Sequence, residues 1–371
     1  MKAIEQELAN LKKAVADLKS NAPPALPHAM AVCDVTTNQI ADCQLHIRGE
    51  VNNLGESVPR GFLQVCGTGD ARIRSDSTER IEMSGRLALA NWLTDPDHPL
   101  TARVAANRIW MRLMGEGIVR TVDNFGSRGE RPSHPELLDA MAIELVRRGW
   151  SRKHLIRQIV MTDAYQRSSE SNGKSESLDP ENRLLWRAHR KRLPAESVRD
   201  AMLVVSGELD RTERVDTMAG YGTLVTANNG NSKASHKVTV SDAKRTLYLP
   251  VIRNEIPPLL STLDAADPDL LVGKRPTTNV PAQALALIGS DVVRDWADQT
   301  AQRLVESIDG TDERIDWVYQ AVLQRSPVQS DRELVRAWLS SERAQALKND
   351  QQRWREWIAA MFAGTEFRIL E

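Results

Sequence analysis

The sequence predicts a mainly α-helical protein: an irregular multi-helix domain that follows a short N-terminal β-hairpin or linker region, with a few short strands. Two observations lead to this fold class. Apolar residues recur every three or four positions in most segments after residue 84, and glycine and proline punctuate these segments. We predict an N-terminal amphipathic helix at 1–22, a β-containing linker at 23–83, and a helical domain at 84–371 with an irregular insert at about 211–281.

The first helix carries an apolar stripe. Its members alternate in spacing between four and three positions, as in the a and d positions of a heptad: Ile4, Leu8, Leu11, Val15 and Leu18. So short a stripe does not make a stable free coiled coil. We therefore expect the helix to pack on this protein, or on a partner domain or subunit. A remnant of a preceding module would have this character.

The linker has a strand-like pattern. Residues 29–33 and 44–48 flank a polar turn and predict a β-hairpin or two short strands, whereas 53–61 read as connecting loop. Cys33 and Cys43 could form a disulfide in an exported protein, or could be two reduced, half-buried thiols. Because the chain lacks a C-x-x-C pair, a zinc knuckle, a thioredoxin-type pair and a haem attachment motif are excluded.

The rest of the chain reads as helices separated by loops. Helices are predicted at 84–93, 100–114, about 137–148, from 151, at 182–190 and at 194–209. A polar loop is predicted at 168–177, a long loop at 211–243, a strand at 246–252 and a proline-punctuated stretch at 257–281. Four final helices are marked by Trp296, by Tyr319, by Trp338 and by Trp354 with Trp357.

Charge and hydropathy exclude several function classes. The 49 Lys and Arg against 50 Asp and Glu leave a formal charge of −1, without the basic field that non-specific nucleic-acid binding needs. No apolar run approaches the ~20 residues of a membrane helix, and the N-terminus has no signal-peptide pattern. We expect no nucleic-acid partner, no membrane span and no cofactor, and the location cannot be read from the chain.

Arg103, Asn107 and Trp110 lie on one face of a predicted helix. A guanidinium beside an amide and an indole could bind an anion or a carbohydrate. In the alternative interpretation, Arg103 pairs with a carboxylate such as Asp123, and Trp110 fills the core.

Asp123 and His134 are candidates for a general acid/base pair or part of a metal site. The chain has no H-x-x-x-H or H-E-x-x-H motif, so no metal site is predicted. Ser133 and Glu136 have the spacing of a capping box, which accounts for much of this segment structurally.

Glu196 is the third catalytic candidate. It stands four positions before Asp200, as a paired-carboxylate glycosidase site could require, although a salt-bridged helix end gives the same spacing. Arg245, on a predicted strand, and Arg275, beside Lys274 before a helix start, could hold an anion. The P-loop, nucleophile-elbow and dinucleotide-binding motifs are absent.

Ordered motifs from about residue 85 to the C-terminus resemble one family, the planctomycete cytochrome-associated C-terminal domain known as PSD-one, a domain of unknown function. The motifs include R-L-A-L-A-N-W-L-T, H-P-L-T-A-R-V-A-A-N-R-I-W, G-I-V-R-T-V-D-N-F-G, P-S-H-P-E-L-L-D and a closing G-T-E-F. The resemblance implies a large exported protein of the cell envelope or periplasm, in which relatives carry a c-type cytochrome module, a sister domain and sometimes carbohydrate-binding modules. It supplies no catalytic residues.

The chain departs from the family pattern. It lacks the C-x-x-C-H of the cytochrome module and the sister domain, so it resembles a shortened member. Asn124 stands where a second Asp is common, which weakens a paired-carboxylate site around Asp123.

Two functions remain. The first is an uncharacterised helical module of a cell-envelope multidomain protein that binds a partner domain or a glycan without catalysis. The alternative is a hydrolase-type enzyme acting on an anionic polysaccharide, with a site between Arg103, Asn107, Asp123 and His134 to which Glu196 or Arg245 contributes.

Overall fold

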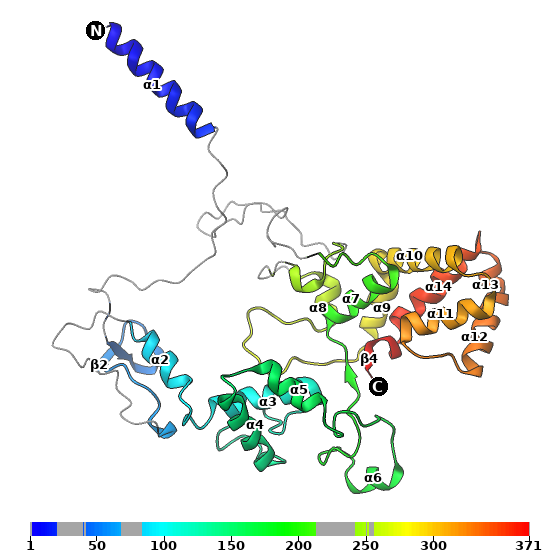
Figure 1. The fold of residues 1–371 in the computed structure, drawn as a ribbon, viewed down its shortest axis with the longest axis horizontal. Helices are drawn as coiled ribbons and strands as arrows, with labels where there is room; N and C mark the ends of the chain where they lie inside the picture. Colours follow the sequence, from blue (N-terminus) through cyan, green and yellow to red (C-terminus); the bar gives the residue numbers. More distant parts are fainter. Residues whose placement is uncertain are drawn as a thin grey trace. The chain divides into compact units, whose positions relative to one another are not determined.

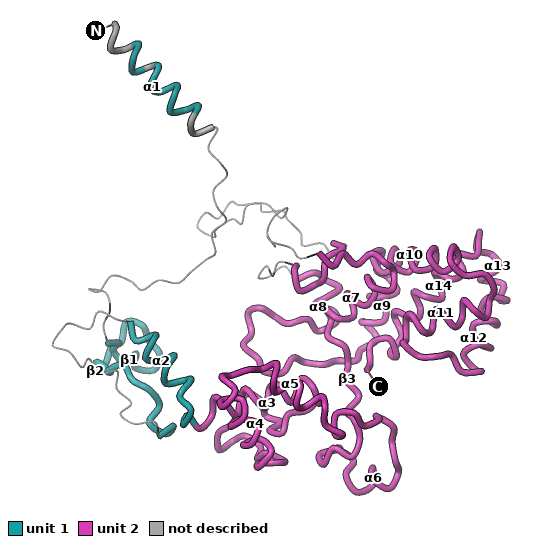
Figure 2. The backbone as a smooth tube through the Cα atoms, in the orientation of Figure 1, with its two compact units in different colours: residues 1–98 teal, residues 99–371 magenta. Residues whose placement is uncertain are grey.

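The computed structural model describes residues 2–20, 40, 42–67, 84–212, 242–249, 251 and 256–370. The chain divides into two compact units, Met1–His98 and Pro99–Glu371 (Figures 1 and 2). The prediction of a mainly α-helical fold with a small N-terminal hairpin and a few short strands is confirmed. Within the described ranges, no helix combines the length and the apolar character needed to cross a membrane.

The first unit contains two helices and a hairpin. Its elements are α1 (Lys2–Ser20), β1 (Cys43–His46), β2 (Leu54–Val58) and α2 (Arg86–Leu93). The stripe residues of α1 whose side chains are described, Leu8, Leu11 and Val15, are all exposed. The side chains of Ile4 and Leu18 lie outside the described residues.

The hairpin pairs a different second strand from the one predicted. β1 is antiparallel to β2, so residues 54–58, predicted as loop, form a strand. Arg48 and Gly49 between the strands have φ angles of 56° and 78°, which lets the chain reverse there. Residues 29–33 and Cys33 lie outside the described residues. Cys43 is an exposed free thiol.

The second unit begins with three helices around their own core (Figure 1). They are α3 (Thr101–Met114), α4 (Pro135–Arg147) and α5 (Arg152–Val160). Their apolar faces bury Ala106, Trp110, Leu138, Leu145 and Leu155 together, as the 3–4 spacing predicts. Gly115, at φ 96°, ends α3 in a conformation that a Cβ would disfavour.

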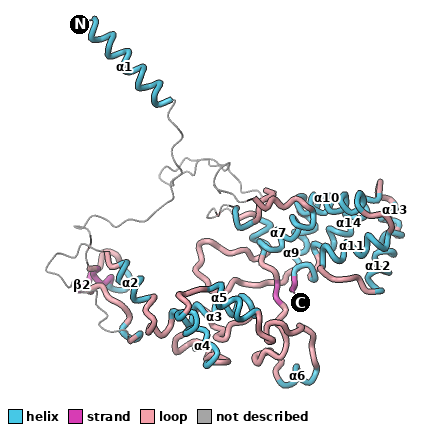
Figure 3. The backbone as a smooth tube through the Cα atoms, viewed as in Figure 1, coloured by secondary structure: helices cyan, strands magenta, loops and turns pink. Residues whose placement is uncertain are grey.

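The segment after α5 is mostly loop (Figure 3). It holds α6 (Gly173–Leu178) in the predicted polar loop, and residues 182–190, predicted as a helix, are irregular. The reason lies in Asn182, which is buried at φ 53° and whose amide binds both the N–H and the C=O of Arg187. These contacts close a loop in place of a helical turn. β3 (Lys191–Arg192) follows and pairs with β4 (Ile369–Leu370).

The remaining helices surround a second core. They are α7 (Ala195–Ser206), α8 (Pro258–Thr262), α9 (Pro281–Gly289), α10 (Asp291–Ser307), α11 (Thr311–Leu323), α12 (Gln329–Ser340), α13 (Glu342–Gln345) and α14 (Asp350–Ala363). α10 packs on both α7 and α14. The core includes Trp296, Leu304, Trp354, Ile358 and Phe362.

Two local predictions are wrong here. The four predicted late helices are six, because Ser290 adopts an extended conformation (φ −81°, ψ 120°) that separates α9 from α10, and α13 is a separate short helix. The strand predicted at 246–252 is a 3-10 turn at Thr246–Tyr248. Arg199 and Asp200 hold this turn against α7 through hydrogen bonds to Thr246.

Candidate functional site

The predicted clamp residues on α3 make structural contacts. The Arg103 Nε donates to Asp139 on α4 at 2.6 Å, and its Nη1 donates to the carbonyl of Pro99 at 2.5 Å. The partner of Arg103 is therefore Asp139 and not Asp123, because α3 packs directly against α4. The side-chain amide of Asn107 is fully buried and binds both the N–H and the C=O of Val119, each at 2.9 Å.

Trp110 lies in the same core with 5% of its surface exposed. None of the nine tryptophans, all of them within the described ranges, is exposed: Trp110, Trp296 and Trp354 are buried and the other six are half-buried. Trp110, the indole of the predicted clamp, therefore fills the core, as the alternative interpretation expected.

Asp123 hydrogen-bonds to a segment that is distant in the sequence, the loop at Gly273. Its Oδ1 accepts from Arg108 at 3.2 Å, and its Oδ2 accepts from the backbone N–H of Gly273 at 2.8 Å. This contact holds the loop before α9 against the loop after α3. The carboxylate is half exposed, and both of its hydrogen-bond donors belong to this chain.

His134 is the residue before α4, and its Nδ1 lies 2.9 Å from the Ser133 hydroxyl. The predicted capping box at Ser133 does not form. The residue before a proline avoids the helical region, so His134 stays non-helical (φ −134°, ψ 80°) and the helix begins at Pro135. His134 borders a cavity of about 20 Å³, which has room for a water molecule and not for a substrate.

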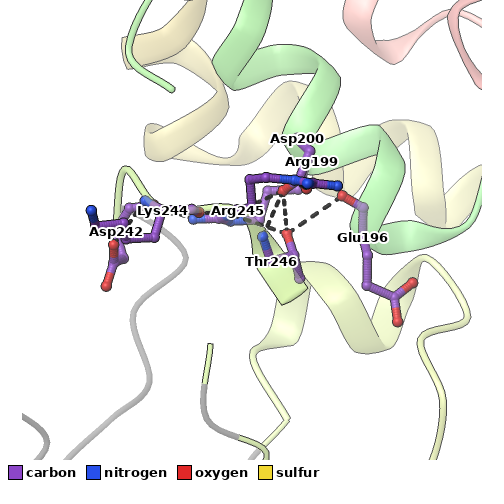
Figure 4. Close-up of polar contacts among 7 residues, drawn as sticks. All are labelled: Glu196, Arg199, Asp200, Asp242, Lys244, Arg245 and Thr246. Atoms are coloured by element: carbon purple, nitrogen blue, oxygen red, sulfur yellow. Dashed lines mark hydrogen bonds and ion pairs between the residues drawn. The ribbon is translucent and has the colours of Figure 1, made fainter. Parts of the chain in front are cut away.

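Glu196 and Asp200 point in different directions (Figure 4). Asp200 accepts from the N–H and the hydroxyl of Thr246, at 2.8 and 2.6 Å, and so fixes the 242–249 segment on α7. The Nε of Arg245 lies 3.9 Å from Asp200. Glu196 instead accepts from Arg275, whose Nη1 lies 2.8 and 2.9 Å from the two carboxylate oxygens. The two carboxylates thus serve different parts of the fold.

A groove of about 820 Å³ lies between the end of α3, the 189–194 segment, residues 263–264 and residues 273–277. We call it the basic groove. Its cations are Arg112, Arg190, Lys191, Arg192, Lys274 and Arg275, and its carboxylates are Glu116 and Asp264. Among the described residues, no Phe, Tyr or Trp lines it. The lining therefore has six cations and two carboxylates, on a protein whose formal charge is −1. A third carboxylate, that of Glu196, pairs with Arg275 from outside the lining.

A family model matches residues 85–339; the family is PSD1, described as a protein of unknown function (DUF1553). The match covers more than half of the chain. This protein belongs to the PSD1 family. Comparison with the curated proteins and with the solved structures found no match.

All residues that line the basic groove fall within the part matched by the PSD1 model. β4, which closes the ribbon with β3, lies beyond it. The basic groove of this chain therefore lies wholly within the part that the PSD1 model matches.

Sequence reasoning found Lys274 and Arg275 and missed the others. The run Arg190-Lys191-Arg192 is the signal that could have found three of them, since consecutive cations create a local positive potential that attracts anions. Arg112 gave no signal. It stands as an ordinary polar residue on the exposed side of α3.

Two titratable groups that line the groove, Lys191 and His189, have a lowered pKa. Burial lowers the pKa of Lys191, whose ammonium donates to the carbonyl of Leu113 at 2.5 Å and lies 5.6 Å from the ring of Tyr165. Burial likewise lowers the pKa of His189. Within the described ranges, no group of three or more His, Cys, Asp and Glu side chains is placed to hold a metal ion.

Proposed function

We propose that the PSD1 domain of this chain is a binding module for an anionic polysaccharide, which lies in the basic groove and is not cleaved there. The observation that carries this proposal is the six-to-two excess of cations over carboxylates in a groove of about 820 Å³. That volume is within the ~300–1,000 Å³ typical of ligand sites.

The lining chemistry favours a polysaccharide over other polyanions. Protein interfaces concentrate aromatic side chains at their centre and exclude charges. Single-stranded nucleic acids are held largely by stacking on aromatic rings. The basic groove has neither kind of aromatic surface, whereas carboxylates or sulfates on a flexible sugar chain need only arginine, lysine and hydroxyl donors.

A binding role without catalysis is supported by the contacts of the candidate catalytic residues. Asp123 holds Gly273, His134 contacts Ser133, and Glu196 is paired with Arg275. Each contact has a structural purpose. The hydrolase alternative needs these groups to face one open cavity, and no observation favours it.

The test is isothermal titration of the protein with a sulfated oligosaccharide, an oligogalacturonide and a neutral oligosaccharide of equal length. Arg112→Gln is the informative variant, because Arg112 is exposed in the groove and pairs with no carboxylate among the described residues. Arg343→Gln is the matched control, because Arg343 is also exposed on a helix, outside the groove.

We expect binding of one or both acidic chains, weakened several-fold by Arg112→Gln and by added salt, and unchanged by Arg343→Gln. Equal affinity for the neutral chain, or equal loss in both variants, would contradict the proposal. Release of reducing sugar ends during incubation would favour the hydrolase instead.

The exposed stripe of α1 supports a second proposal, that this helix binds a partner domain or subunit of a multidomain cell-envelope protein. Leu8, Leu11 and Val15 are each at least half exposed. The size of the protein in solution, measured with and without residues 1–20, tests it. The proposal would be contradicted if the number of chains per particle is the same with and without residues 1–20, and if no partner protein binds in a way that depends on the stripe.

A further inference from the structure

A second pocket adjoins the basic groove. It has a volume of about 250 Å³ and shares Arg190, Arg192 and Thr277 with the groove. Its other polar lining groups are Thr278, Asn279, Thr365 and Arg368, and no carboxylate of the described part of the chain lines it. We call it the arginine pocket.

Arg368 is buried without a counter-charge. Only 4% of its surface is exposed, and its guanidinium donates to two neutral oxygens, the carbonyl of Gly364 and the Oε1 of Gln283, both at 3.3 Å. No carboxylate pairs with it among the residues that the structure describes. Burial lowers the pKa of Arg368, and the charge of Arg192 lowers it further.

Arg192 is only partly satisfied. Its Nη1 donates to Asp264 at 2.7 Å and to the carbonyl of Thr278. Its Nε and Nη2 are buried and have no hydrogen-bond partner among the residues that the structure describes. Asp264, held at φ 63°, also accepts from Thr278 and Gln283. The carboxylate of Asp264 is therefore the one negative charge that pairs with Arg192, and the described residues place no second carboxylate on the nearby guanidinium of Arg368.

The pairing of β3 with β4 places Arg192 close to Arg368. In the β3–β4 ribbon Arg192 is opposite Ile369, and the N–H of Leu193 donates to the carbonyl of Arg368 at 2.7 Å. Arg190, two positions before Arg192, also lines the pocket. Asp264 pairs with Arg192, whereas Arg368 is buried beside it with neutral partners alone among the described residues. A buried charge with no counter-charge costs stability, and such groups concentrate at functional sites.

We propose that the arginine pocket is the terminal-group subsite of the basic groove, where Arg368 and Arg192 bind the oxyanion, a carboxylate or a sulfate, of the last sugar of the chain. This inference rests on the proposed function of the groove. The pocket is too small for more than one sugar ring, since it falls below the ~300–1,000 Å³ of drug-sized ligand sites. Guanidinium forks and threonine hydroxyls match the oxygens of either anion.

The experiment uses the full chain with two small probes, inorganic sulfate and galacturonate, and compares them with chloride at matched ionic strength. Binding is measured by titration and by the rise in melting temperature. We expect at least one probe to bind, which also identifies whether the terminal group is a sulfate or a carboxylate.

Arg368→Met keeps the bulk of the buried side chain and removes its charge, and it should weaken that probe at least about tenfold. Thr365→Val is a second variant at an exposed position and should weaken it several-fold while leaving the fold intact. Arg112→Gln, in the groove but outside the pocket, should leave the affinity for the small probe within about twofold.

The outcomes separate the two proposals. If neither probe binds better than chloride, or if Arg368→Met and Thr365→Val bind as tightly as the wild type, the arginine pocket is overturned while Arg112-dependent binding of the oligosaccharide stands. If the probe binds in an Arg368-dependent way but no oligosaccharide binds, the polysaccharide proposal fails, and with it the terminal-group role.

Discussion

The substitution Asn107→Ala separates a structural amide from a binding one. Both hydrogen bonds of the Asn107 side chain, each 2.9 Å long, go to the backbone of Val119, and the residue has no exposed surface. Alanine would leave the N–H and the C=O of Val119 without partners inside the first core of the second unit. Each orphaned buried group costs about 1–3 kcal/mol.

The two groups together therefore cost about 2–6 kcal/mol, and a water molecule entering the vacated space moves the cost toward the lower end. We expect a loss of about 3 kcal/mol in the free energy of unfolding. In a urea titration, with a slope of about 3 kcal/mol per M for a protein of this size, the midpoint should fall by about 1 M.

The matched control is Gln302→Ala, because Gln302 is exposed on α10 and its amide donates a hydrogen bond to Glu306, one turn along the same helix. This variant should stay within about 0.5 kcal/mol of the wild type. A midpoint shift for Asn107→Ala below about 0.3 M would refute the structural role. Loss of oligosaccharide binding at unchanged stability would show that Asn107 contacts the ligand.

Three further substitutions test the groove and its supports. Glu196→Gln releases the guanidinium of Arg275, paired at 2.8 Å, so the affinity for the sulfated oligosaccharide in calorimetry should rise about two- to fivefold, and a fall would contradict this. Burial raises the pKa of Asp264, but the hydrogen bonds that it accepts and its arginine partner lower it below 3.8 overall. Its carboxylate therefore stabilises the fold above pH ~4 and loses that effect as the pH falls through the lowered pKa. The difference in unfolding midpoint between wild type and Asp264→Asn should shrink as the pH is lowered below ~4, and a constant difference would be evidence against it. Asp123→Ala removes the acceptor 2.8 Å from the N–H of Gly273, so hydrogen exchange at that amide should quicken at least about tenfold by mass spectrometry; an unchanged rate would show that the loop is held elsewhere.

The helices could be predicted because their signal is local. α3 and α4 each carry apolar residues at 3–4 spacing that become one buried face, and Gly115 marks the end of α3. The loop around Asn182 could not be predicted, because it depends on one buried amide that binds the backbone five residues away. Local propensity gives no indication of such a contact.

The site could be predicted only in part, since it is assembled from distant segments. Arg275 stood out as a cation before a helix, but its partner Glu196 is 79 positions away. Arg103 was expected to find a carboxylate, and it does so on α4 at Asp139, because helix packing and not sequence proximity chooses the partner. Arg368 lies next to the closing motif, and nothing near it in the sequence indicates a pocket.

The balance of charges inside the groove explains why an anion would be retained there. Asp264 and Glu116 neutralise Arg192 and Lys274 within the fold. Lys191 receives only a carbonyl and a ring face as partners. An acidic ligand would supply the missing negative charge, and its binding would stabilise the folded state by about 2.7 kcal/mol at a hundred times its Kd. On this proposal, a bound anion would also reduce the repulsion between Arg192 and Arg368, which lowers the pKa of Arg368.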